Sequence, residues 1–230
     1  MLFEPMYEFL ERFDLAVEAF NFITTALIAF GSLYAFSKTH KPRHAAFGIG
    51  FLIIALGLFL SVVFNWFIEI ESMVIPLRGY IQMSYVLAGI LLLSMLCVLA
   101  GYLILFIVAQ EITSLKTIAL VLLLAPLGVW VAHEFYTGYH VLSFIVTLFI
   151  FHHYVRVHID DRGRHSLPIA SAFGILMISQ ATLALTALSS LFYVAGHLFR
   201  LISFAVLFVT LVSIYRTTSY APKTSARKRA

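Results

Sequence analysis

The chain has 230 residues, of which 62% are hydrophobic and 11% are charged. A water-soluble domain carries roughly a quarter charged and about half apolar residues, so no soluble fold covers this much apolar surface. The formal net charge is +4, but the basic residues gather in particular loops and in the tail, which argues against a nucleic-acid groove.

Seven apolar stretches of membrane-spanning length follow one another along the chain. At about 20 residues per span, they predict transmembrane helices at about 15–36, 45–67, 81–109, 117–133, 140–156, 168–188 and 192–214. The polar interruptions at 133–140 and 188–192 are short, and an error at either would make the count six. We expect an all-α polytopic integral membrane protein with a seven-transmembrane-helix bundle.

These stretches divide the chain into three parts: an outer N-terminal segment at 1–14, a transmembrane domain at 15–216 and a basic cytoplasmic tail at 217–230. The N-terminus lacks the basic region of a secretory signal, so we expect no cleavage. The tail has almost no apolar residues and should be disordered. Its basic cluster should attract anionic lipids by about 1 kcal/mol per charge, or alternatively dock a protein partner.

Lysine and arginine mark the cytoplasmic side, because cytoplasmic flanks retain them during insertion. The flanks predicted as cytoplasmic carry Lys38, Lys41, Arg43, Lys116, Arg156, Arg162, Arg164, Arg216, Lys223, Arg227, Lys228 and Arg229. The opposite flanks offer only Arg12 and Arg78. We therefore expect the N-terminus outside and the C-terminus in the cytoplasm, in a cell membrane.

The last predicted span contains a buried cation. Arg200 lies roughly 12 Å below the start of this span at 1.5 Å per residue, and its guanidinium cannot lose its charge. An ionisable group within a bilayer costs about 2.5–3.5 kcal/mol on insertion scales. Arg200 must therefore reach an anion, a carbonyl or water, and His197 shares its helix face three residues earlier.

Other polar residues are expected at similar depth on the outer side. They are His133 and Glu134 at the end of the fourth span, His140 at the start of the fifth, Glu18 and Asn21 near the top of the first, and Asn65 at the outer end of the second. With His197 and Arg200 they predict an outward-opening pocket that binds a small ligand, lipid or ion.

Three other interpretations of these residues stay open. The histidines and Glu134 can be solvated loop residues near the membrane surface. Arg200 can be a structural tether to Glu18 or to a carbonyl. The third is a metal site with three histidine ligands, His133, His140 and His197.

Three classes of membrane protein with known chemistry do not fit the pattern. A zinc protease needs two histidines four residues apart on one helix, but His133 and His140 are separated by seven. A retinal protein needs a lysine within a span, and every lysine lies in a loop or the tail. An intramembrane aspartyl protease needs two aspartates within spans, and the three aspartates lie at or beyond span ends. We therefore expect no catalytic residues.

A rival hypothesis is a b-type haem protein that carries electrons across the membrane. Axial histidines on facing helices hold haem in helical bundles. One haem could use His197 with His133 or His140. A second could use His44 with His152, which we expect to be the best-buried histidine pair on the cytoplasmic side.

Residues 192–204 read FYVAGHLFRLISF. This segment resembles the final helix of multi-span membrane-associated sensor (MASE-type) domains, which precede histidine kinases and cyclases and repeat a similar His-then-basic pattern. The resemblance implies a sensor-like module in which His197 and Arg200 are the matching positions. In that family a signalling domain follows, whereas this sequence ends after the basic tail, so any output would require a separate partner.

The sequence thus favours a membrane module that binds a small ligand, lipid or ion around His197 and Arg200. The alternatives are a haem electron carrier, a transporter and a structural membrane subunit. Transport ranks below sensing, because the mid-depth polar residues Ser94, Gln180 and Thr182 are too few to draw a conduction path.

Overall fold

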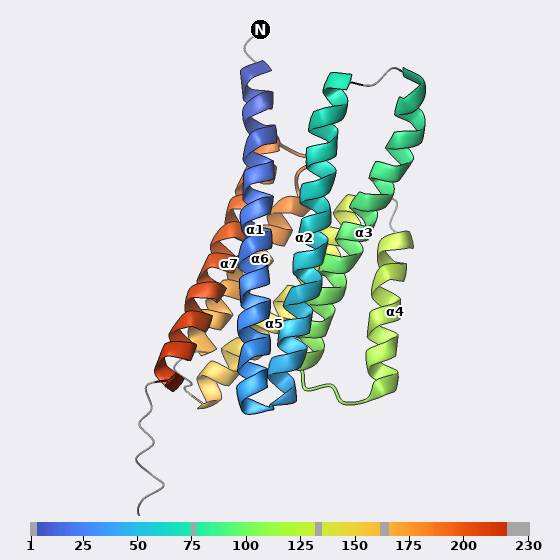
Figure 1. Cartoon of the computed structure of the whole chain (residues 1–230). Helices are drawn as coiled ribbons and strands as arrows, with labels where there is room; N and C mark the ends of the chain where they lie inside the picture. Colours follow the sequence, from blue (N-terminus) through green and yellow to red (C-terminus); the bar gives the residue numbers. More distant parts are fainter. Residues whose placement is uncertain (1–3, 75–76, 132–134, 162–165, 220–230) are drawn as a thin grey trace, which may run out of the picture.

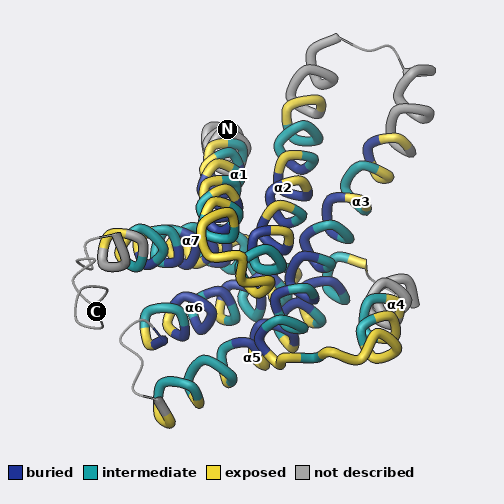
Figure 2. Tube along the Cα trace, turned by 60° about the horizontal axis from the view of Figure 1, so that its bottom comes forward, coloured by how far each residue is buried: buried dark blue, intermediate teal, exposed yellow. Residues whose placement is uncertain are grey.

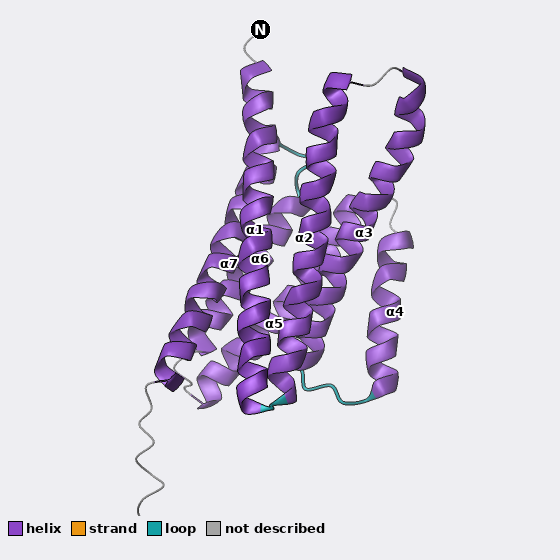
Figure 3. Ribbon diagram, in the orientation of Figure 1, coloured by secondary structure: helices purple, strands orange, loops and turns teal. Residues whose placement is uncertain are grey.

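The computed structural model describes residues 4–74, 77–131, 135–161 and 166–219, and these ranges contain helices and no strand (Figures 1 and 3). The helices are α1 (Glu4–Thr39), α2 (Pro42–Val74), α3 (Leu77–Ala109), α4 (Leu115–Val131), α5 (Phe135–Asp161), α6 (Ser166–Ala184) and α7 (Ser190–Ser219). Successive helices run in opposite directions, so α1 begins at one end of the bundle and α7 ends at the other (Figure 1). The all-α prediction is confirmed.

Six helices close into a ring. Going round the ring, α1 packs against α2, α2 against α3, α3 against α5, α5 against α6, and α6 against α7. Helix α7 packs against α1 and closes the ring. Helix α4 stands outside this ring and contacts only α3 and α5 among the described elements (Figure 2). The interior of the ring holds the buried residues, coloured dark blue in Figure 2.

The six ring helices are long and apolar enough to cross a membrane. Helix α4 has 17 residues, or about 26 Å at 1.5 Å per residue, against a hydrocarbon thickness of roughly 30 Å. The sequence predicted seven helices of spanning length. The described residues contain seven helices, of which six have that length.

Helix ends differ from the predicted span ends. Helix α1 begins at Glu4 rather than at 15, and α5 begins at Phe135 rather than at 140. Hydropathy locates the apolar part of a helix, while backbone hydrogen bonding continues through the polar residues beyond it. As a consequence His140 lies more than a turn inside α5 instead of at its start.

The short junction after α6 is a true break. Helix α6 ends at Ala184, and tight turns follow in which Thr186 N donates to Leu183 O at 3.3 Å and Leu188 N donates to Leu185 O at 2.9 Å. Helix α7 then starts at Ser190. The two last helices are therefore separate, as predicted.

The helices bury several polar side chains and expose many large apolar ones. Buried polar residues of α1 are Glu18, Asn21, Thr24, Thr25 and Ser32. Its exposed large residues include Phe20, Ile23, Leu27 and Phe30. The ring helices α2, α5 and α7 also carry exposed large apolar side chains. This distribution suits hydrocarbon as the surrounding solvent, because exposed apolar area on this scale is rare in soluble monomers.

Candidate functional site

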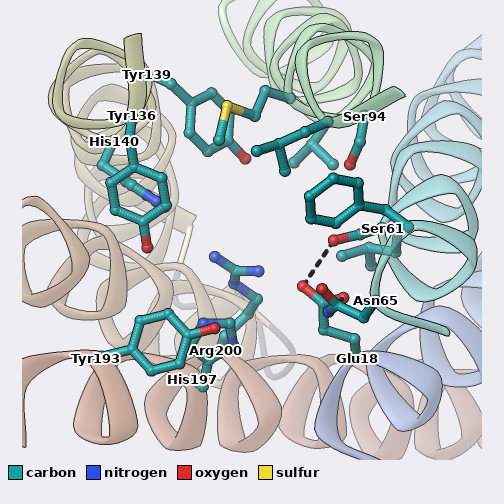
Figure 4. A pocket seen from close by; sticks show the side chains of 15 residues that line it. Glu18, Ser61, Asn65, Ser94, Tyr136, Tyr139, His140, Tyr193, His197 and Arg200 are labelled. Carbon is teal, nitrogen blue, oxygen red and sulfur yellow. Dashed lines mark hydrogen bonds between the residues drawn. The ribbon is translucent and has the colours of Figure 1, made fainter. Parts of the chain in front are cut away.

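A cavity of about 200 Å³ lies inside the ring of helices. Five of the six ring helices line it, and α6 is the exception. Its lining residues are Glu18 from α1, Leu58, Ser61, Phe64 and Asn65 from α2, Leu91, Ser94, Met95 and Val98 from α3, Tyr136, Tyr139 and His140 from α5, and Tyr193, His197 and Arg200 from α7 (Figure 4).

The acidic side of the cavity is built by α1 and α2. Glu18 is 6% exposed, and both of its carboxylate oxygens accept hydrogen bonds from α2. Ser61 Oγ donates to Oε1 at 2.8 Å, and Asn65 Nδ2 donates to Oε2 at 2.9 Å. Ser61 and Asn65 are four residues apart, so they share one face of α2. Hydrogen bonds of this kind are charge-assisted and hold the carboxylate in one orientation.

The basic side of the cavity is built by α7. Tyr193, His197 and Arg200 follow one another at spacings of four and three, and Phe204 and Leu207 continue the same inward face below them. Arg200 is 7% exposed, and its buried Nε has no hydrogen-bond partner in the described part of the chain. Figure 4 shows its guanidinium pointing into the cavity. The guanidinium N–H groups of Arg200 therefore face the cavity rather than a neighbouring helix.

Helix α6 supports the site from behind. His140 Nδ1 lies 2.7 Å from Gln180 Oε1, and Gln180 Nε2 donates towards the Tyr102 hydroxyl at 3.5 Å. A carbonyl oxygen can only accept, so His140 donates its Nδ1 proton in this arrangement. A neutral His140 then keeps an acceptor lone pair on Nε2.

Each cavity histidine is packed against a tyrosine one turn earlier on its own helix. The ring centroids of Tyr136 and His140 are 4.4 Å apart, and those of Tyr193 and His197 are also 4.4 Å apart. The ring centroids of Tyr139 and His140 are 4.7 Å apart. These contacts fix the two imidazoles within the wall of the cavity.

Five residues predicted from the sequence meet at this cavity: Glu18, Asn65, His140, His197 and Arg200. Asn21 does not line the cavity; it is fully buried on α1, and its side-chain oxygen and nitrogen have no hydrogen-bond partner among the described residues. The predicted site residues His133 and Glu134 lie outside the described residues.

No protein-family model matches this chain, and no curated protein or solved structure matches it either. The resemblance of residues 192–204 to MASE-type domains therefore stays a prediction.

The structure does not contain the predicted ion-pair tether between Arg200 and Glu18. Within the described residues no carboxylate forms an ion pair with Arg200. Glu18 reaches the cavity from α1, the helix that packs beside α7 (Figure 4). The carboxylate is held by Ser61 and Asn65 instead.

Sequence reasoning missed the three tyrosines and Ser61. A signal for two of the tyrosines was present, because the pattern of a tyrosine four residues before a histidine occurs at Tyr136 and His140 and again at Tyr193 and His197. Residues four apart share a helix face, so a tyrosine so placed joins its histidine. Ser61 carried no such signal, since serine is common in transmembrane helices.

The described residues contain no group of three histidine, cysteine, aspartate or glutamate side chains that could hold a metal ion. His140 and His197 face one cavity, and the third proposed ligand, His133, lies outside the described residues. A haem between His197 and His140 or His133 stays a prediction.

The expected burial of the second haem pair is wrong. His152 is exposed and His44 is only partly buried. On α5 the inward face runs through Ser143, Val146 and Ile150, and His152 lies off this face. Its neighbour His153 is less exposed. His152 therefore continues the outward face of the helix.

Proposed function

We propose that this chain is a seven-span cell-membrane protein that binds a small ligand in an outer-facing pocket, as a sensor-like module. The observation that carries the proposal is the meeting of Glu18, His140, His197 and Arg200 around one cavity. Ligand sites are typically concave and largely apolar, with a few convergent polar groups that orient the ligand. The cavity inside the ring has this composition.

The distribution of basic residues supports an outer location for the pocket. Lys38 and Arg216 lie on the same two helices as Glu18 and Arg200, roughly 25–30 Å further along at 1.5 Å per residue. The hydrocarbon of a bilayer is about 30 Å thick. With these basic residues at the cytoplasmic surface, the pocket lies at the outer edge of the hydrocarbon, where water can enter.

Exposed aromatic residues fit the same placement. Trp66 is 52% exposed and follows Asn65, which lines the cavity. Tryptophan is enriched at membrane–water interfaces because its ring is apolar while its N–H needs a polar partner. Trp66 thus marks the outer interface at the level of the pocket.

Arg200 favours binding over a purely structural role. A structural arginine within a bundle is expected to be paired with neighbouring groups, whereas this guanidinium points into the cavity (Figure 4). Arginine presents a rigid fork of donors that matches carboxylate and phosphate groups. Its presence makes an anionic group on the ligand the expected partner.

The arrangement of the pocket suits a sensor. Five helices contribute to it, so a ligand that binds one arrangement of the helices better than another shifts the equilibrium between them. Helix α7 carries Arg200 and continues to the basic residue Arg216 at the opposite end. We propose that a separate partner reads this end of the bundle, and that the basic tail at 217–230 lies against anionic lipids.

Thiol labelling tests the pocket. In a Cys97→Ala background, Ser61→Cys places a thiol in the cavity, and Ser171→Cys places one on the exposed face of α6 as a control. We expect a membrane-impermeant methanethiosulfonate reagent, added to intact cells, to modify Ser61→Cys and not Ser171→Cys, because thiols in hydrocarbon do not ionise.

A screen of small metabolites by thermal shift supplies the second part of this test. Compounds that stabilise the wild-type protein but not Arg200→Gln should also slow the labelling of Ser61→Cys. The proposal is wrong if Ser61→Cys is inert from the outer side and no stabilising compound depends on Arg200.

A further inference from the structure

A second hollow, of about 520 Å³, lies along α7 and shares no lining residue with the cavity inside the ring. Pro168, in the first turn of α6, forms one wall of it. The other lining residues all belong to α7, and they are Leu201, Ile202, Ala205, Val206, Val209, Thr210 and Ser213. We call this hollow the α6–α7 groove.

The neighbouring helices leave this face of α7 uncovered. Among the described helices, α7 contacts only α1 and α6 (Figure 2). Ser203 Oγ donates to Ala172 O at 2.8 Å, which holds α6 against one side of α7. A Cβ at Gly31 would lie 2.7 Å from Leu211 Cδ2, so α1 packs closely against another side. Val209 faces neither helix, because it is 65% exposed.

Hydrocarbon lines most of the length of the groove. Leu201, Ile202, Val206 and Val209 present branched apolar side chains to it. The hydroxyl of Thr210 is already used within α7, because its Oγ1 donates to Val206 O at 2.7 Å. An apolar occupant therefore displaces no hydrogen bond of this hydroxyl.

The groove leads to a cation. Arg216 follows Val209 by seven residues, or about two turns, so the two residues lie on one face of α7. Arg216 is exposed and lies in the last turn of the helix. From Leu201 to Ser213 the lining extends about 18 Å at 1.5 Å per residue, close to half of the roughly 30 Å of hydrocarbon in a bilayer. An apolar surface about one leaflet deep thus ends near a guanidinium at headgroup level.

We propose that the α6–α7 groove binds an acyl chain of an anionic phospholipid whose phosphate contacts Arg216. Such a lipid joins an apolar chain to an anionic group, and so it matches both the lining of the groove and the charge at its end. The guanidinium presents a rigid fork of donors that fits a phosphate. This surface is separate from the proposed ligand pocket, and the inference does not depend on that pocket.

A lipid fits this face better than a helix of a second protein. Close packing of membrane helices is favoured by small residues at the contact. Ile202 and Val209 are branched and exposed, and they would hold a second backbone away from α7. A flexible acyl chain can follow such side chains.

Native mass spectrometry of the purified full-length protein, released from detergent micelles, tests the inference. The probes are phosphatidylglycerol and phosphatidylcholine with palmitoyl and oleoyl chains, and dihexanoyl phosphatidylglycerol, whose chains are too short to fill the groove. We expect the first long-chain phosphatidylglycerol to bind more tightly than phosphatidylcholine by about fivefold or more, the effect of one basic residue near a membrane surface. The dihexanoyl lipid should bind more weakly than the long-chain lipid with the same headgroup.

Two variants test the two parts of the site. Arg216→Gln should reduce the preference for phosphatidylglycerol by about fivefold, and Val209→Trp should abolish it by filling the groove. The matched controls are Arg156→Gln and Val141→Trp, at exposed positions of α5, and both should keep the wild-type preference. All four substitutions are at exposed positions, so thermal unfolding should show that each variant is folded.

Three results would overturn the inference. Equal effects of Arg216→Gln and Arg156→Gln, or equal binding of the two long-chain lipids, would leave only a general attraction of lipids to the surface. Binding of the dihexanoyl lipid as tight as that of the long-chain lipid would show that the groove holds no acyl chain. A dimer mass that Val209→Trp removes would make the groove an interface between two copies of the chain.

Discussion

His140 on α5 is held in place by Gln180 on α6, with 2.7 Å between His140 Nδ1 and Gln180 Oε1. Both residues are almost fully buried. Helix α6 does not line the cavity, but through Gln180 it holds His140, which does. It orients the imidazole and leaves Nε2 on the other side of the ring.

Replacing this glutamine should destabilise the bundle. In Gln180→Leu the buried His140 Nδ1 loses its partner, at a cost of about 1–3 kcal/mol in the free energy of unfolding. Unfolding by SDS titration measures the change, and Ser171→Ala, on the exposed face of the same helix, is the control. Equal stability of the two variants would show that the contact has no energetic role.

The close approach of α2 and α3 depends on glycine. A Cβ at Gly101 would lie 2.4 Å from Ile54 Cγ1 and 2.7 Å from Gly50 O, whereas a Cβ at Gly89 would meet nothing within 4 Å. Small residues let membrane helices approach in this way. Gly101→Ala should therefore destabilise the protein by about 1–3 kcal/mol because its methyl group overpacks the interface.

Gly89→Ala is the matched control on the same helix. Alanine is a better helix former than glycine by about 1 kcal/mol, so this variant should be as stable as the wild type or more stable. SDS unfolding compares the two directly. If Gly101→Ala is as stable as Gly89→Ala, α2 and α3 do not pack closely enough at Gly101 to exclude a methyl group.

The layer of polar residues could be predicted from the sequence because depth in a membrane can be counted along each helix. Glu18, His140 and Arg200 lie at similar distances from the basic ends of their helices, and antiparallel helices bring residues of equal depth into one layer. Counting depth does not tell which way a residue faces. Asn21 shows this, since it lies one turn below Glu18, is equally buried, and is outside the cavity lining.

The order of helices around the ring could not be predicted. Seven apolar stretches of similar length carry no information on which helix stands outside, because lipid and helix surfaces are almost equally apolar. The structure leaves α4 outside and joins α3 to α5. The pairing of Glu18 with Ser61 and Asn65 depends on this order, as does the support of His140 by Gln180.

The proposed orientation predicts which loops face the cytoplasm. Ser37, at the end of α1, and Ser190, at the start of α7, are both exposed and lie at opposite ends of the bundle. In a Cys97→Ala background, an impermeant maleimide added to intact cells should label Ser190→Cys at once and Ser37→Cys only after permeabilisation. The reverse pattern would place the pocket on the cytoplasmic side, and labelling of both from outside would contradict an odd number of spans.

A binding arginine and a structural arginine differ in what their removal does to stability. Arg200 is charged although it is only 7% exposed, and its Nε has no hydrogen-bond partner among the described residues. Methionine of similar length removes the cost of burying that charge. We therefore expect Arg200→Met to leave the free energy of unfolding of the ligand-free protein unchanged, or to raise it by up to about 2 kcal/mol.

Ligand binding should be lost in Arg200→Met even though the stability of the ligand-free protein is kept or raised. Arg200→Met should abolish stabilisation by any ligand that raises the melting temperature of the wild-type protein, because the anionic group loses its donors. Arg156→Met, at an exposed position of α5, should keep that stabilisation. SDS unfolding without ligand and thermal shifts with ligand measure the two effects separately. If Arg200→Met fails to fold without ligand, Arg200 is a structural residue of the ring. The packing of the helices would then depend on Arg200 even when no ligand is bound.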